Sequence, residues 1–157
     1  MKFTFAGASS DQHDHGGAPA GIPLPFAGAP SGAGGSGPGS SVLELVVTRS
    51  ADGSELVCEG LSGDGVVYAS ARRAVLGADT ATLALALRSV LARGGAELPE
   101  PLLGSVSAVV LDLGGCERET LESLGLSVSP SGQMLAQVDE ALQARTGITA
   151  GTPMQLR

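Results

Sequence analysis

The sequence has 157 residues and a formal charge of −7, from 9 basic and 16 acidic side chains. This length allows one folded domain with an extension. An acidic chain whose only lysine is Lys2 offers no basic surface for a phosphate backbone, and no run of about 18 apolar residues occurs. We therefore expect neither nucleic-acid binding nor insertion into a membrane. Two cysteines are too few for a disulfide scaffold, so we expect reduced thiols in an intracellular, cytoplasmic protein.

Residues 1–41 differ in composition from the rest, because Gly, Ala, Pro and Ser dominate them. Such a segment buries too little apolar surface to offset the entropy lost when its backbone is ordered. The sequence therefore predicts a disordered, flexible tail at 1–41 and a single globular domain at 42–157. The tail is not expected to be a secretory signal, since Asp11 and His13 interrupt it before an apolar core develops.

The tail contains all three phenylalanines, Phe3, Phe5 and Phe26, and it repeats the tetrapeptide Phe-Ala-Gly-Ala at 5–8 and 26–29. An exposed phenylalanine gains nothing from contact with water. One interpretation is therefore a pair of short anchors that dock into an apolar pocket on a partner or on the domain itself. The alternative is a chance repeat in a segment of biased composition.

The tail also holds the only histidines, His13 and His15, within the segment 11–15. Two imidazoles in a flexible chain make a weak, open site for Zn²⁺, Ni²⁺ or Cu²⁺. A solvated polar spacer is the simpler interpretation, and we expect no metal and no cofactor.

Three β-strands are predicted at the start of the domain, at 42–49, 54–60 and 66–76. These segments are rich in β-branched residues, and turn residues separate them. The first turn, Ser50-Ala51-Asp52-Gly53, is typical of a hairpin, so we expect an antiparallel meander.

A helix is predicted next, capped by Asp79 or Thr80 and ended by the pair Gly94-Gly95. A loop over 98–101 follows, with two prolines. The segment 105–113 is short, β-branched and the most apolar of the domain, which indicates a central buried strand. A right-handed crossover would place it parallel to the first strand.

Two further helices are predicted, at 117–124 and 132–146. The first carries Glu117, Arg118 and Glu119, which we expect on a solvated face. The order β-β-β-α-β-α-α predicts an α/β fold: a mixed sheet of a three-stranded meander and a parallel strand, with two to three helices.

This element order resembles the ribonuclease-H-like fold and the half-domains of actin-like sugar kinases, and the segment 146–153 is similar to a Gly-rich loop of carbohydrate kinases. The nuclease resemblance implies metal-binding carboxylates on the first strand, the first helix and the end of the fourth strand. Asp112 matches the last position and Glu44 lies in the first strand, but 80–93 contains no acid. Nuclease activity is therefore not expected.

The kinase resemblance implies a phosphate-binding hairpin between the first two strands. The turn 48–54 has a glycine and hydroxyls, but no Asp closes the first strand. These kinases also bind ATP between two such domains, and the chain has room for one. A subunit or inactive relative of such an ATP-binding enzyme is therefore the alternative function.

Cys116 follows Gly114-Gly115 at the start of a predicted helix, where backbone N–H groups could stabilise a thiolate. The histidines lie far away in the tail, and Glu117 and Glu119 would oppose ionisation. A small apolar cap residue is the ordinary interpretation, and a thiol-dependent activity at Cys116 is a third alternative.

Arg72 and Arg73 form the only basic doublet and could bind a carboxylate or phosphate of a partner. The alternative is a strand end in which one arginine pairs with an acid and the other reaches solvent.

Each catalytic site considered above lacks at least one residue that its chemistry requires. Charged residues are only 16% of the chain, which favours exposed apolar surface unless a partner covers it. We therefore expect a non-catalytic protein-interaction or assembly module. It would dock on a larger protein, as a hetero-complex or homo-oligomer, through an apolar helix face or a free sheet edge, with the tail adding anchors.

Overall fold

The computed structural model describes residues 42–157. The predicted anchors Phe3, Phe5 and Phe26 and the histidines His13 and His15 lie outside the described residues, so their roles stay predictions.

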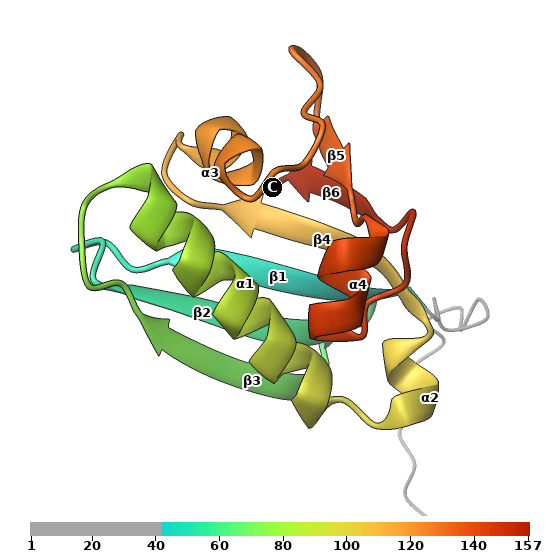
Figure 1. The fold of residues 1–157 in the computed structure, drawn as a ribbon. Coiled ribbons are helices and arrows are strands. Elements are labelled where there is room, and N and C mark those ends of the chain that lie inside the picture. The colour runs from blue at the N-terminus through green and yellow to red at the C-terminus, as the bar shows by residue number, and fades with distance from the viewer. Residues whose placement is uncertain (1–41) are drawn as a thin grey trace, which may run out of the picture. The chain divides into compact units, whose positions relative to one another are not determined.

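Six strands form one mixed sheet (Figure 1). The strands are β1 (Leu43–Arg49), β2 (Glu55–Ser62), β3 (Val67–Ala74), β4 (Val106–Asp112), β5 (Met134–Gln137) and β6 (Pro153–Leu156). Their order across the sheet is β3-β2-β1-β4-β6-β5. The first three strands are an antiparallel meander, β4 lies parallel to β1, and β6 parallel to β4. The predicted α/β class, with a meander followed by a parallel strand, is confirmed.

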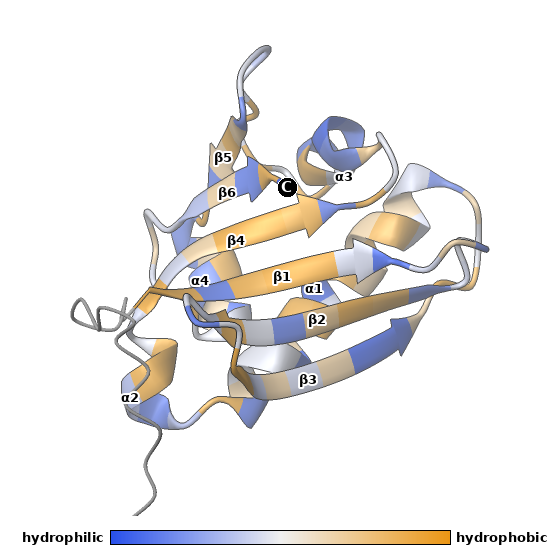
Figure 2. Cartoon of the chain, turned by 180° about the vertical axis from the view of Figure 1, so that it is seen from behind, coloured by the Kyte–Doolittle hydropathy of each residue, from blue (hydrophilic) through white to orange (hydrophobic). Residues whose placement is uncertain are grey.

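Four helices belong to the described residues rather than the two to three expected. They are α1 (Thr80–Glu97), α2 (Glu100–Leu103), α3 (Glu117–Ser123) and α4 (Glu140–Thr146). Helices α1, α3 and α4 lie on one face of the sheet (Figure 1). The view from behind shows the strands in front of α1, and none of the helices formed by residues 42–157 crosses the second face (Figure 2). The helix-covered face holds the core, where Leu45, Val47 and Leu111 are fully buried with Leu87 and Val90 of α1.

Helix α1 begins where the sequence predicts, because Asp79 caps it. Asp79 Oδ1 accepts a hydrogen bond from the Thr82 backbone N–H at 2.8 Å, and Oδ2 accepts one from the Thr82 hydroxyl at 2.6 Å. These two bonds hold the pKa of the Asp79 carboxyl below its ordinary value. The cap supplies partners for N–H groups that a helix start otherwise leaves unpaired.

The prediction that Gly94-Gly95 ends α1 was wrong, since the helix continues to Glu97. Both glycines instead lie where a neighbouring element approaches the backbone of α1 closely. A Cβ at Gly94 would lie 2.7 Å from Cys58 Sγ, and one at Gly95 would lie 2.4 Å from the carbonyl oxygen of Thr146. The close packing of α1 against β2 and α4 therefore explains the glycine pair, which the sequence pattern alone would assign to the end of a helix.

The predicted helix at 132–146 was also wrong in its first half. Residues 134–137 form β5, and only 140–146 are helical, with Asp139 Oδ1 accepting a hydrogen bond from the Leu142 N–H at 2.7 Å. Strand β5 forms because β6 pairs with it, and β6 begins at Pro153, the last residue of the segment likened to a Gly-rich loop. The predicted loop at 98–101 likewise contains the start of α2.

Candidate functional site

The carboxyl ends of the parallel strands β1 and β4 lie side by side, and Asp112 ends β4 opposite Thr48 of β1. Its Oδ2 lies 3.8 Å from Arg157 Nη1, with both side chains well exposed. Among residues 42–157, no group of three or more His, Cys, Asp or Glu side chains lies close enough to hold a metal ion. Asp112 therefore faces a cation rather than the converging acids that two-metal chemistry needs.

The turn after β4 is organised by Glu117 rather than by Cys116. Gly114 and Gly115 have φ values of 77° and 93°, which favour glycine. Glu117 Oε1 accepts hydrogen bonds from the backbone N–H groups of Leu113 at 2.7 Å and Gly115 at 3.1 Å. Glu117 is only 7% exposed, so the prediction of a solvated face was wrong for this residue. It is drawn inward because its carboxylate satisfies two backbone donors.

Cys116 is partly buried, and its sulfur lies between two groups. The thiol donates to the carbonyl oxygen of Leu113 at 3.0 Å, and Arg49 Nη1 donates to the sulfur at 3.7 Å. Arg49 also donates from Nε to the carbonyl oxygen of Gly53, which holds it across the strand ends. A guanidinium cannot accept a proton, so this contact supplies charge but no general base. Sequence spacing gave no signal for Arg49, because 67 residues separate it from Cys116.

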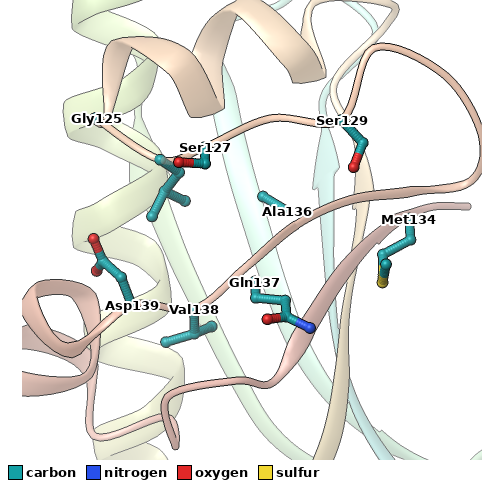
Figure 3. Close-up of a pocket in the computed structure, with 9 residues that line it drawn as sticks. Gly125, Ser127, Ser129, Met134, Ala136, Gln137, Val138 and Asp139 are labelled. Carbon is teal, nitrogen blue, oxygen red and sulfur yellow. The ribbon is translucent and has the colours of Figure 1, made fainter.

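A hollow of about 450 Å³ lies beside β5 (Figure 3). It opens between the chain after α3 and the segment that leads from β5 to α4. Its lining residues are Gly125, Leu126, Ser127, Ser129, Met134, Ala136, Gln137, Val138 and Asp139. Its one carboxylate, Asp139, already caps α4, and the other polar groups are hydroxyls and an amide. This set can form hydrogen bonds but contains no acid–base pair for catalysis.

Arg72 and Arg73 lie at the end of β3, the strand at one edge of the sheet. Arg72 Nη1 lies 3.6 Å from Glu55 Oε2, and the Arg72 carbonyl oxygen accepts a hydrogen bond from Arg93 Nη1 of α1 at 3.5 Å. A hollow of about 310 Å³ separates this strand from α1. It is lined by Ser70, Ala71, Arg72, Arg93, Ala96 and Glu97. Arg72 is therefore part of a groove that sequence reasoning did not predict.

The face of the sheet without helices, here termed the open face, is mixed in character. Along β1 and β2 its residues alternate with the buried core, and all are partly exposed. They are Glu44, Val46, Thr48, Glu55, Val57, Glu59 and Leu61. Val46 lies between Glu59 of β2 and Val110 of β4. Within residues 42–157, the ion pairs on this face join Arg72 to Glu55 and Arg157 to Asp112, which leaves Glu44 and Glu59 without a cation.

Comparison with protein-family models, curated proteins and solved structures found no match to this chain. The resemblance to ribonuclease-H-like and actin-like domains therefore stays a prediction from element order. In the described part of the chain, no helix is both long enough and apolar enough to cross a membrane.

Proposed function

We propose that this chain is a non-catalytic protein-interaction module that docks on a larger protein through the open face. The observation that carries the proposal is that the helices of residues 42–157 cover one face of a sheet whose strands β1, β4 and β6 run parallel. Parallel sheets are ordinarily covered by helices on both faces, and their strands are hydrophobic for that reason. The second layer would then come from another protein.

The composition of the open face favours a helix with basic residues as the second layer. Val46 and Val57, both partly exposed, supply an apolar band against which a helix can pack, and Val110 lies buried beside Val46. Glu44 and Glu59 would pair with Lys or Arg at the border of that band. A second copy of the same face is disfavoured, because the glutamates of the two copies would be buried together.

The tail would add to this docking. Phe3, Phe5 and Phe26 would act as anchors that fill apolar pockets of the partner, joined to the domain by a Gly-rich spacer. Arg72, which pairs with Glu55 of the open face, would contribute a cation at the border of that face, next to β2.

Affinity capture from cells with charge variants tests the open face. The full chain, a Val46→Glu/Val57→Glu variant and a Leu85→Glu control would serve as baits. Leu85 is a suitable control because it is 55% exposed on α1, across the sheet from the open face. We expect the same partner with the wild-type chain and the control, and its loss with the open-face variant. Equal capture by all three folded baits would contradict the proposal.

A further inference from the structure

We infer that the groove between the outer edge of β3 and α1, here termed the edge groove, binds an extended acidic segment of a partner protein by strand addition. The edge groove is defined by Ser70, Ala71, Arg72, Arg93, Ala96 and Glu97. The edge groove lies along the outer side of β3 and adjoins the open face at Arg72, and it would make a second contact with the partner.

The backbone of β3 can accept another strand. β3 is the end strand of the sheet, and among residues 42–157 it pairs with β2 alone. At Arg72 the carbonyl oxygen is occupied by the side chain of Arg93. No other strand of the described chain lies along the outer edge, so the N–H and C=O groups that point away from β2, other than this carbonyl, are open to pairing. Unpaired edges of this kind are templates for an incoming strand.

The space beside this edge fits a peptide backbone. The hollow of about 310 Å³ lies between β3 and the last turns of α1. Ser70, Ala71 and Ala96 are small, so an added strand can approach the edge without displacing a large side chain. Arg93 and Glu97 border the hollow from α1, on the helix side of the sheet.

The two ends of the strand differ in chemistry. At its start, Val66, Val67 and Tyr68 are 46%, 50% and 48% exposed, which is a continuous apolar stretch. At its end lie Arg72 and Arg73, with Arg93 beside them. These three are a third of the chain's nine basic residues, in a protein of charge −7. Glu97 lines the same groove and Glu55 pairs with Arg72, so three arginines face two acids and the net charge at this end stays positive. This positive charge favours an acidic segment.

The spacing along β3 sets the pattern that a partner segment needs. Ala69 and Ala71 are buried toward the helices, which places Tyr68 on the open face and Arg73 on the helix side. Five strand positions separate Tyr68 from Arg73, or about 17 Å. The segment would thus carry an apolar residue against Tyr68 and, about five positions away, an Asp or Glu that reaches Arg73 and Arg93.

A second copy of this chain is a poorer occupant. Antiparallel pairing of two β3 strands about a two-fold axis would bring Arg72, Arg73 and Arg93 of both copies to one short seam. Like charges across neighbouring strands are destabilising. An acidic peptide meets the same arginines with the opposite charge.

Selection from a displayed library of random peptides of about ten residues, with the full chain as target, tests the inference. We expect enrichment of proline-poor peptides that carry an apolar residue and an acid about five positions apart. Their affinity should fall about tenfold or more in Arg93→Glu and less in Arg93→Gln. It should be unchanged in Arg145→Glu, the same charge reversal on an exposed residue of α4, and in Val46→Glu on the open face. Bound peptide should also slow amide exchange at residues 67–71.

Three results would overturn the inference. The first is enrichment of peptides that carry no Asp or Glu. The second is peptide binding that is unchanged in a folded Arg93→Glu variant. The third is self-association in light scattering that Arg93→Glu abolishes, which would make a second copy the occupant. Failure here is distinguishable from failure of the open-face proposal, because Val46→Glu alters one surface and Arg93→Glu the other.

Discussion

Glu117 bends back over the turn that precedes it, so that its Oε1 accepts a hydrogen bond from the Leu113 N–H at 2.7 Å. The same oxygen accepts a second bond from the Gly115 N–H. The end of β4 and the start of α3 are thereby tied together, and Cys116 is held beside Arg49. The turn that carries Cys116 thus has a structural organisation of its own, and a thiol-dependent activity there stays a prediction.

Removing the Glu117 carboxylate should destabilise the fold. Glu117→Ala leaves two backbone donors without their partner, at a cost of about 1–3 kcal/mol. Glu117→Gln should lose less, because its amide oxygen can still accept. Urea unfolding followed by circular dichroism measures both. Glu119→Ala, an exposed position of the same helix, is the matched control, with an expected change within about 0.5 kcal/mol. A Glu117→Ala variant as stable as this control would contradict the assigned role.

Gly95→Ala should destabilise the domain even though alanine favours helices by about 1 kcal/mol. The added Cβ would meet the Thr146 carbonyl oxygen at 2.4 Å, and backbone of α4 cannot move aside freely. We expect a net loss of about 1–3 kcal/mol in thermal or urea unfolding. Gly104→Ala is the control, since its Cβ would lie 4.0 Å from the nearest atom. A stabilised Gly95→Ala variant would show that α1 and α4 do not approach closely there.

Alkaline pH should weaken the fold through Cys58. Burial, and then the charge of Glu59, raises the pKa of the Cys58 thiol to about 12 from an ordinary value of 9.0. The unfolded chain therefore releases this proton first as pH rises. The contribution of the buried thiol is complete below pH 9.0 and is lost as the pH rises toward 12.

Urea unfolding of the wild-type chain and Cys58→Ala at several pH values isolates this effect. The free energy of unfolding should fall more steeply for the wild-type chain, by up to about 1.4 kcal/mol per pH unit. Parallel slopes for the two proteins would mean that Cys58 is accessible to solvent.

Mg-ATP should not stabilise the isolated chain if the open face serves protein docking rather than nucleotide binding. A ligand at 100 times its Kd adds about 2.7 kcal/mol and raises the unfolding temperature by several degrees. Thermal unfolding with and without millimolar Mg-ATP makes the comparison. A clear upward shift would favour the ATP-binding alternative drawn from the kinase resemblance.

The parts of the fold that follow from local chemistry could be predicted. β-branched runs and turn residues marked the meander, and Asp79 marked the start of α1. The segment 105–113 was apolar enough to be recognised as the central strand. Gly94 and Gly95 misled the prediction because their role is a contact with β2 and α4, which no local pattern contains.

The C-terminal third was harder because its elements are short. β5 and β6 have four residues each, too few to reveal a period of two. Within residues 42–157, β5 pairs with β6 alone, and β6 pairs with β4 as well. Of the residues that line the edge groove, the sequence singled out Arg72, which it predicted with Arg73 as a partner contact. Arg93 and Glu97 were not singled out, because they join the groove only when α1 packs beside β3.

Site-specific photo-crosslinking from position 46 tests docking on the open face most directly. A benzophenone amino acid would replace Val46 in the full chain and, as a control, the exposed Leu85 of α1. After irradiation in extracts of the source cells, we predict one discrete heavier product from position 46, joined to a Lys- or Arg-rich helical segment. Docking on the open face would be contradicted if the position-46 variant gave no crosslinked product. It would also be contradicted if the variants at positions 46 and 85 gave the same product.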